Sequence, residues 1–303
     1  MNYFKVFNQS LKKGISYATK NKKIITDEFS KVISSIENDF YKNFQNKTNN
    51  FLLSQMDKRI MANMVFVSSF ESKSGFAIEA CAKKIARLKF GITNVPTIVN
   101  PRNLQHNINP NSINGQIVVT DVDTTNGNLR GEIASFRANN EAYGKGKNRI
   151  ESRVTQETIR KTLFPLSIKY KTNRIYTKPV DLAFFDGTRW NIAELKAGGD
   201  LDSSNAPSNV EKLLTIYVDM GILDCNTYFV ALYNKNGEGR TWTGSVKKHL
   251  NYPSMFLIGS NFWNKILLDN IDFHLFEQIY HDALVELDLN SHINSLINKF
   301  IEA

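Results

Sequence analysis

The sequence predicts an α/β fold in which a mixed β-sheet is flanked by helices, and two observations carry that prediction. First, two apolar segments enclose Asp186-Gly187, and an Asp-Gly pair between apolar runs is a strong signal for a β-hairpin. Second, a helical pattern separates this hairpin from another apolar segment over residues 225–233. Because a helix between neighbouring strands is the usual crossover of parallel pairing, the sheet should contain antiparallel and parallel pairs, with helices on both faces.

Three regions are expected along the chain. Residues 1–70 form a helical N-terminal extension, residues 71–260 form the core with a basic insert at about 93–175, and residues 261–303 form C-terminal helices packed on the core. The chain has 303 residues, of which 42% are hydrophobic and 22% charged. This composition is ordinary for a folded protein that buries a sizeable core.

The apolar segments and the cysteines indicate the cell compartment. No apolar run reaches the roughly 18 residues of a membrane span, and the start of the chain lacks the apolar segment of a secretory signal. We therefore expect no membrane partner. The two cysteines, Cys81 and Cys225, are too few for a disulfide framework or a four-cysteine zinc site. Both lie among apolar residues, so we expect buried, reduced thiols and a cytoplasmic location.

The chain is basic, with 38 lysine and arginine residues against 29 aspartate and glutamate residues and a formal charge of +9. A surplus of this size suits a polyanionic partner, because each neutralised phosphate releases counterions. Charge alone leaves open a basic protein that binds no nucleic acid.

In the first 115 residues the pattern is helical and then irregular. Spacings such as those of Phe40, Phe44, Phe51 and Leu52 indicate helices, and no glycine or proline interrupts residues 16–74. A strong helix is predicted over 74–90, capped by Ser72 or Ser74 and ended by Gly91. The asparagine- and proline-rich residues 93–114 are expected to form a loop.

The middle of the chain carries the basic insert. Residues 116–122 predict a strand. Residues 130–153 are basic and contain three glycines, so we expect a flexible or DNA-facing segment, followed by a short helix at about 154–163.

Strands are predicted over 180–185 and 188–196, joined by the turn at Asp186-Gly187. A glycine-rich loop over 197–207 then leads to a helix that starts at Ser208, where Ser208 and Glu211 have the spacing of a capping box, and ends at Gly221. The strand over 225–233 precedes a turn with the sequence GEGRTW, and residues 261–303 are mainly helical.

The hairpin register brings three charged side chains to one face. Side chains alternate along a strand, and residues opposite each other share a face. A turn of two or of four residues therefore places Asp181, Glu194 and Lys196 on the same face, whereas an odd-length loop separates them. The alternative is a solvent-facing hairpin with a surface ion pair between Glu194 and Lys196, worth less than about 1 kcal/mol.

These three residue types suit the cleavage of a phosphodiester. Two neighbouring carboxylates repel each other, and Mg²⁺, which prefers one or two carboxylate ligands, removes that repulsion. A metal held by Asp181 and Glu194 supplies a Lewis acid. Lys196 orients the attacking water and pairs with the developing negative charge.

The segment Pro179-Val180-Asp181, followed after twelve residues by Glu194-Leu195-Lys196, resembles the signature of the PD-(D/E)XK nucleases. The resemblance implies a restriction-endonuclease-like core, with a mixed β-sheet flanked by helices. It also implies Mg²⁺, with Mn²⁺ as a substitute, bound by Asp181, Glu194 and the backbone carbonyl of Leu195, with Lys196 assisting the water. The sequence departs from the signature because Val180 separates the proline from the aspartate.

Further segments extend the resemblance. Ser74-Gly75 followed by Glu79 looks like the start of the first core helix in many restriction endonucleases, which implies Glu79 as a third catalytic and metal-binding carboxylate. The alternative is an exposed pair of Glu79 with Lys83, one turn apart. Segments 237–242 and 258–263 are similar to type II restriction endonucleases of the TdeIII type. This implies a bacterial enzyme, double-stranded DNA with short GGNCC-like sites, a homodimer, and a cognate DNA methyltransferase as functional partner.

Basic residues in two segments are candidates for DNA contacts. Arg240 follows the last core strand, and Arg or Lys pairs well with guanine in the major groove. The basic insert supplies the other candidates, of which most are expected to contact phosphates: Arg130, Arg137, Lys145, Lys147 and Arg149, with Asn139 and Asn140.

Three functions remain open. The first is a type II restriction endonuclease, and the second is a repair or junction nuclease of the same kind. The third is a non-catalytic DNA-binding protein, against which the presence of Asp181, Glu194 and Lys196 argues. Sequence-specific rather than structure-specific cleavage separates the first two.

Overall fold

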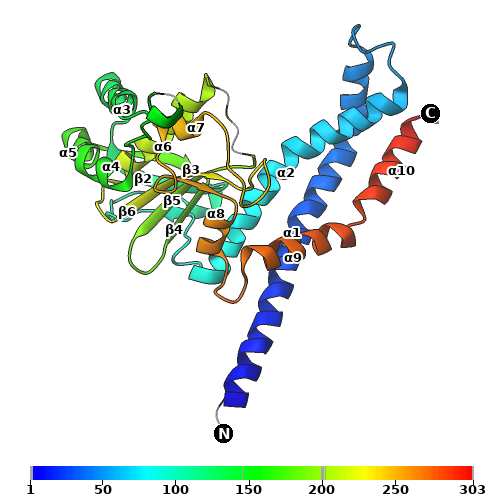
Figure 1. The fold of residues 1–303 in the computed structure, drawn as a ribbon, viewed down its shortest axis with the longest axis horizontal. Coiled ribbons are helices and arrows are strands. Elements are labelled where there is room, and N and C mark those ends of the chain that lie inside the picture. The colour runs from blue at the N-terminus through cyan, green and yellow to red at the C-terminus, as the bar shows by residue number, and fades with distance from the viewer. Residues whose placement is uncertain (1–2, 145, 199–200, 202, 302–303) are drawn as a thin grey trace. The chain divides into compact units, whose positions relative to one another are not determined.

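A computed structural model describes residues 3–144, 146–198, 201 and 203–301 (Figure 1). The chain forms two compact units, one of residues 1–85 with 267–303 and one of residues 86–266. The expected boundaries lay at residues 70 and 260. One helix, α2 (Lys58–Phe90), continues past residue 70 without a break.

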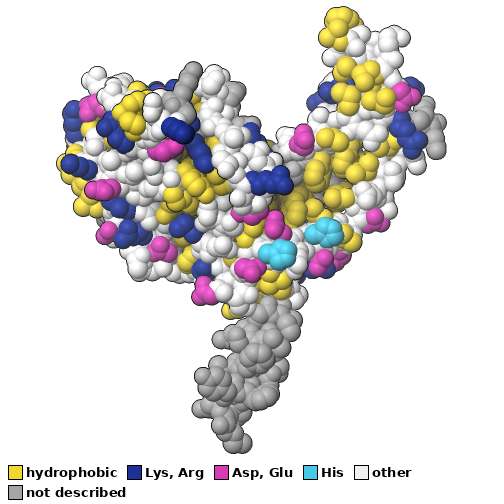
Figure 2. All heavy atoms as spheres, in the orientation of Figure 1, with side chains coloured by type: hydrophobic (Ala, Val, Ile, Leu, Met, Phe, Trp, Pro, Cys, Tyr) yellow, Lys and Arg dark blue, Asp and Glu magenta, His cyan; other side chains and the backbone are white. Residues whose placement is uncertain are grey.

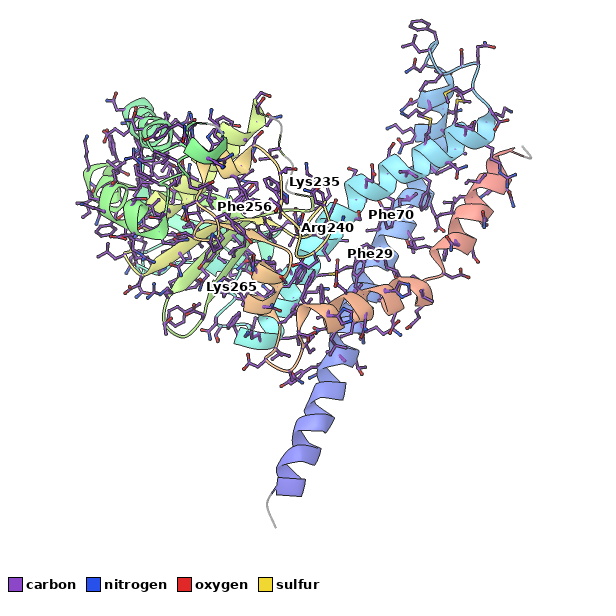
Figure 3. All side chains as sticks on the ribbon, viewed as in Figure 1. Phe29, Phe70, Lys235, Arg240, Phe256 and Lys265 are labelled. Atoms are coloured by element: carbon purple, nitrogen blue, oxygen red, sulfur yellow. The ribbon has the colours of Figure 1, made fainter. Side chains whose placement is uncertain are left out.

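The first unit is helical. Its elements are α1 (Tyr3–Thr48), most of α2, α9 (Phe273–Glu286) and α10 (Leu289–Ile301). Both C-terminal helices pack against α1. Phe29 of α1 is fully buried, and its ring lies 5.4 Å from that of Tyr280 in an edge-on arrangement. The side chains of Phe29 and Phe70 face each other in this unit (Figure 3).

The ends of α1 and α2 differ from the sequence prediction. Phe40 and Phe44 are buried as a helical face should be, but α1 ends at Thr48, so Phe51 lies exposed in the following turn. The start of α2 is capped by Asp57, whose carboxylate accepts hydrogen bonds from the N–H groups of Arg59 and Ile60. Ser72 and Ser74 lie inside the helix and cap nothing, whereas Gly91, with φ of +83°, follows its end as predicted.

The second unit contains two mixed sheets flanked by helices, which confirms the predicted α/β class. The first sheet has the order β1-β2-β3 and the second the order β4-β5-β6-β7. The strands are β1 (Ile98–Val99), β2 (Gln116–Val122), β3 (Lys171–Val180), β4 (Leu182–Phe185), β5 (Trp190–Lys196), β6 (Cys225–Ala231) and β7 (Phe256–Ile258). β2 pairs with β3 and β4 with β5 antiparallel, and β1–β2, β5–β6 and β6–β7 pair parallel.

Asp181 alone separates β3 from β4, and the side chain of Gln116 joins the two sheets. Its amide nitrogen donates to the carbonyl of Ala183 at 2.9 Å, and its amide oxygen accepts from the N–H of Ala183 at 3.0 Å. Gln116 is buried, so this side chain takes the place of a strand residue opposite Ala183. The backbone N–H and C=O groups of Ala183, at the edge of β4, are therefore satisfied.

Helices cover both faces of the second sheet. The helices of this unit are α3 (Gly127–Asn139), α4 (Gln156–Thr162), α5 (Phe164–Lys169), α6 (Asn205–Met220), α7 (Val246–His249) and α8 (Ser260–Ile266), with short 3-10 turns at Pro110–Ser112 and Gly146–Asn148. α6 packs on β2 and β6, and it shares one core with Ala183 and Ile192. On the opposite face Phe184 stacks on Phe90, their rings 4.8 Å apart.

Some predicted elements need correction. The segment expected to be flexible at 130–153 contains most of α3, because Asn126 caps a helix that buries Leu129, Ile133 and Phe136. The crossover helix α6 begins at Asn205, so Ser208 lies in its first turn and forms no capping box. β3 and α5 were not predicted. By contrast, β2, the short helix after residue 154, the strand from Cys225 and the left-handed Gly221 after α6 agree with the sequence prediction.

The expectation for the cysteines is met. Cys81 and Cys225 are buried free cysteines. Among the helices that the structure describes, none combines the length and apolar character needed to cross a membrane.

Candidate active site

The hairpin turn has four residues, Asp186 to Arg189. The N–H of Asp186 donates to the carbonyl of Arg189 at 3.1 Å, and Gly187 has φ of +98°, a conformation that favours glycine. The carboxylate of Asp186 accepts from the N–H groups of Thr188 and Arg189, and these bonds help hold its pKa at about 2 although burial raises it. Phe185 therefore pairs with Trp190 and Leu182 with Ala193. Continuing this register by one residue places Asp181 opposite Glu194, as expected for an even turn.

Asp181 lies at the join between β3 and β4. Its Oδ2 accepts a hydrogen bond of 2.8 Å from the backbone N–H of Leu195 in β5. Its side chain is 24% exposed. Burial and then the negative charge of Glu194 raise the pKa of Asp181, while the Leu195 N–H and the ammonium groups of Lys196 and Lys212 lower it.

Glu194 is the buried member of the site, with its side chain 1% exposed. The Nζ atom of Lys196 lies 2.9 Å from Oε1 of Glu194 and 4.0 Å from Oδ2 of Asp181. Because a buried carboxylate without a partner costs several kcal/mol, on the order of 3–5, this pairing is required for the fold as well as available for chemistry. The surface-pair alternative does not describe Glu194, which is enclosed.

Lys212 completes the cluster and was not predicted from the sequence. It lies in the second turn of α6, and its Nζ is 2.8 Å from each carboxylate oxygen of Glu194. The only signal in the sequence was the crossover itself, which returns α6 over the end of β5. Among the described residues, two carboxylates thus face two ammonium groups at this site.

The backbone of β5 adds a carbonyl on the side of Asp181. The carbonyl of Lys196 accepts from the N–H of Leu232 toward β6. Successive residues of a strand direct their N–H and C=O groups to opposite edges, so those of Leu195 point toward Asp181. The structure therefore brings two carboxylates and one carbonyl to the same edge.

This donor set fits a magnesium ion. Mg²⁺ takes oxygen ligands, commonly one or two carboxylates with several waters. No group of three histidine, cysteine or acidic side chains with metal-binding geometry occurs in the part of the chain that the structure describes. The donors that the site offers are the oxygen atoms of Asp181, Glu194 and the Leu195 carbonyl.

Glu79, the third predicted carboxylate, is partly buried on α2. It belongs to the helical unit of residues 1–85, whereas the other site residues belong to the unit of residues 86–266. Its role stays a prediction.

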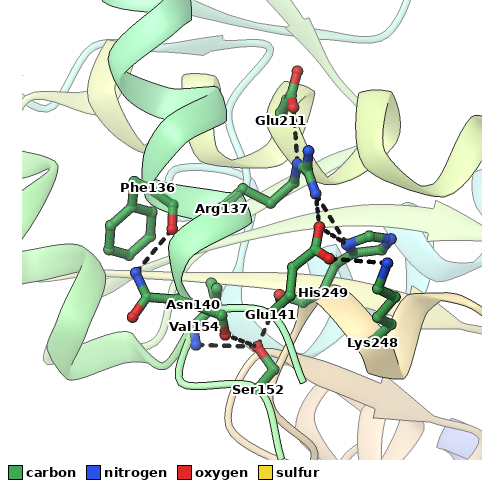
Figure 4. A network of polar contacts seen from close by, with 9 residues as sticks. All are labelled: Phe136, Arg137, Asn140, Glu141, Ser152, Val154, Glu211, Lys248 and His249. Atoms are coloured by element: carbon green, nitrogen blue, oxygen red, sulfur yellow. Dashed lines mark hydrogen bonds and ion pairs between the residues drawn. The ribbon is translucent and has the colours of Figure 1, made fainter. Parts of the chain in front are cut away.

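Arg137, predicted to contact DNA, is held inside the protein (Figure 4). Its side chain is 13% exposed, its Nε lies 2.8 Å from Glu211 of α6, and its Nη1 pairs with Glu141. Glu141 also contacts the ring of His249 at 2.8 Å and Lys248 at 3.0 Å. The guanidinium thus links α3 to α6, and its groups are used within the fold.

The other DNA-contact candidates are at the surface where the structure describes them. Lys147 and Arg149 are exposed, and Arg149 lies 3.2 Å from Glu151. Lys145 lies outside the described residues. Figure 2 shows lysine and arginine side chains spread over the visible face of the unit of residues 86–266.

Arg240 lies in the loop between β6 and α7, which also contains Lys235 (Figure 3). Trp242 holds this loop in place. Its ring is buried, and the centroid of that ring lies 4.8 Å from the centroid of the Phe256 ring. Arg240 is exposed and lines a pocket with Asn234, Tyr252 and Asn261. The loop starts beside the candidate site, because Leu232 pairs with Lys196.

Comparison with known proteins gives no match: no family model, no curated protein and no solved structure matches this chain. The geometry of the site therefore carries the functional argument.

Proposed function

We propose that this chain is a Mg²⁺-dependent DNA endonuclease of the PD-(D/E)XK kind. The observation that supports this best is the four-residue turn, which sets Asp181 opposite Glu194 with Lys196 on the same face. The order helix α2, strand β2, hairpin β4–β5, helix α6 and parallel strand β6 also agrees with the core that the resemblance implies. The basic charge of +9 favours a DNA substrate.

The finer form of the proposal is a type II restriction endonuclease that acts as a homodimer on short palindromic sites. A palindrome read by two identical surfaces requires a two-fold dimer. Exposed Arg240, Lys147 and Arg149 are then the candidates for DNA contacts. A DNA methyltransferase of the same specificity is the functional partner in this form.

Asp181, Glu194 and the Leu195 carbonyl are the residues that would hold Mg²⁺, which supplies Lewis acidity at the phosphoryl oxygens. Asp181 remains partly exposed and so accessible to a ligand. Lys196 orients the attacking water and stabilises the negative charge that develops on the phosphate. The N–H of Leu195 fixes the carboxylate of Asp181 in place before substrate binds.

Digestion of unmethylated plasmid DNA with Mg²⁺ tests the proposal. We expect discrete fragments, and we expect Glu194→Gln or Asp181→Asn to reduce the rate by at least about 100-fold, as loss of a group that acts on the transition state does. Glu157→Gln, at an exposed position of α4, is the matched control and should cleave at the wild-type rate.

The outcomes separate the candidate functions. Fragments with a common end sequence support the restriction form, whereas cuts only at branched or damaged DNA favour a repair nuclease. DNA binding without cleavage under Mg²⁺ or Mn²⁺ would overturn the catalytic proposal and leave a DNA-binding module.

A further inference from the structure

Glu194 receives more positive charge than a single catalytic lysine provides. Lys196 and Lys212 reach its carboxylate from different elements, β5 and α6, at 2.9 and 2.8 Å. Lys212 contacts both oxygens of Glu194, so it covers the part of the carboxylate that a cation would use. No step in the proposed chemistry employs Lys212.

The charges of the described residues at the site balance one another. Among the described residues, the carboxylates of Asp181 and Glu194 face the ammonium groups of Lys196 and Lys212. A divalent cation added to this cluster would leave an excess of positive charge, with two ammonium groups within a few ångströms of it. Repulsion at that range in a partly buried site is strong, so one ammonium group has to leave.

The exposure and the ion pairs of the two lysines indicate which ammonium group leaves. The side chain of Lys212 is 46% exposed, against 31% for Lys196. Lys196 also lies 4.0 Å from Asp181, whereas the ion pair of Lys212 is with Glu194 alone among the described residues. A long side chain at the edge of a helix can extend its ammonium group into water without moving the backbone.

We propose that Lys212 is the resident counter-ion of Glu194 in the metal-free protein and that its ammonium group leaves this carboxylate when a divalent cation binds. This inference rests on the proposed function in one respect, the assignment of the cation to Asp181 and Glu194. Lys212 is then a positioning residue that pairs with the buried carboxylate and holds it in place until the cation arrives. The released ammonium group is a free cation beside the site and is available to a DNA phosphate.

Chemical labelling of lysines in the wild-type protein tests the displacement directly. Amine acetylation is measured by mass spectrometry with EDTA and with Mg²⁺, in the absence of DNA. We expect Lys212 to react about fivefold faster with Mg²⁺, the change that corresponds to loss of a partly exposed ion pair. Lys161, exposed on α4, is the internal control and should react at one rate in both conditions. Asp181→Asn should abolish the response of Lys212.

Calorimetric titration with Mn²⁺ provides a second measurement. Lys212→Met removes the competing ammonium group, so we expect this variant to bind the cation about fivefold more tightly. Lys212→Arg keeps the charge and can contact both oxygens, so it should bind no more tightly than wild type. Lys161→Met is the matched control and should be unchanged.

The outcomes distinguish the counter-ion role of Lys212 from the proposed metal site. If Mn²⁺ binds the wild type but not Asp181→Asn, and Lys212 shows no change in labelling or in the variants, the counter-ion role is wrong while the proposed metal site stands. If no divalent cation binds the wild type at this site, both the counter-ion role and the proposed function are overturned.

Discussion

Asp219, on the inner side of α6, is a fully buried carboxyl group. Burial raises its pKa to about 7, and the positive charge of Lys178 and the hydroxyl groups of Thr124 and Thr120 lower it by less. In the unfolded chain an aspartate titrates near its ordinary value of about 4. The folded protein therefore holds a proton on Asp219 that the unfolded chain releases, and the free energy of unfolding falls as pH rises from about 4 to about 7.

Asp219→Asn should remove this pH dependence, because an amide has no proton to lose. Relative to wild type, we expect its free energy of unfolding to gain about 2 kcal/mol more at pH 8 than at pH 5. Urea denaturation at the two pH values measures the difference. Equal shifts at both pH values would show that Asp219 titrates alike in the folded and unfolded states.

Arg137 illustrates how an arginine in a basic segment can be bound within the fold. A basic residue in a basic segment favours DNA contact, yet Arg137 is enclosed by Glu141, Glu211 and His249. Burial first, and then the charges of Arg137 and Lys248, lower the pKa of His249 to about 4. This imidazole is neutral at physiological pH, so the positive charges that pair with Glu141 and Glu211 come from Arg137 and Lys248.

Arg137→Met should lower the free energy of unfolding by about 3 kcal/mol, because it leaves the enclosed Glu141 with less compensation. Arg149→Met, at an exposed position, should change it by less than about 0.5 kcal/mol. Thermal and urea denaturation of both variants provide the comparison. Weaker DNA binding with unchanged stability for Arg137→Met would instead support the original prediction of a DNA contact.

At the scale of elements, the link between the two sheets depends on Gln116. Gln116→Leu removes two hydrogen bonds to Ala183 and one to the carbonyl of Pro96, and it leaves buried backbone groups without partners. We expect a loss of about 2–4 kcal/mol in the free energy of unfolding. Gln278→Leu, at an exposed glutamine of α9, should have little effect. Similar values for the two variants would mean that the side-chain link adds nothing to the sheet.

Strong local patterns predicted their elements correctly. β2, the hairpin and the strand from Cys225 combine apolar β-formers with clear turn residues, and these strands are largely buried. β3 escaped prediction because its residues up to Pro179 are exposed or half-buried and most of them are polar. Its pairing with β2 is a tertiary effect, and the local pattern of apolar and polar residues does not indicate it.

The candidate site divides in the same way. Side chains alternate along a strand and the turn has an even length, which predicted one shared face for Asp181, Glu194 and Lys196. The structure has the register that this prediction requires. Lys212 could not be found by such reasoning. Its side chain reaches Glu194 because of how α6 is rotated against β5, and the local sequence does not specify that tertiary arrangement.

At the scale of the whole molecule, the charge of +9 predicts that DNA binding weakens as salt concentration rises. If the exposed Lys147 and Arg149 contact phosphates, each contact contributes about −0.9 to the slope of log binding constant against log salt concentration. The double variant Lys147→Ala with Arg149→Ala should therefore have a slope smaller in magnitude by about 2. Fluorescence anisotropy with labelled duplex DNA over a range of KCl concentrations gives the slope. An unchanged slope would exclude these two residues from the DNA interface.

The single residue between β3 and β4 limits how the length of this chain can vary during evolution. Insertion or deletion of one residue near Asp181 turns either Asp181 or the following strand to the other face and uncouples it from Glu194. The turn from Asp186 to Arg189 accepts changes only in pairs for the same reason. The largely exposed residues 100–115 have no such restriction. Homologous chains should therefore differ in length between β1 and β2 and keep a constant spacing from Asp181 to Lys196.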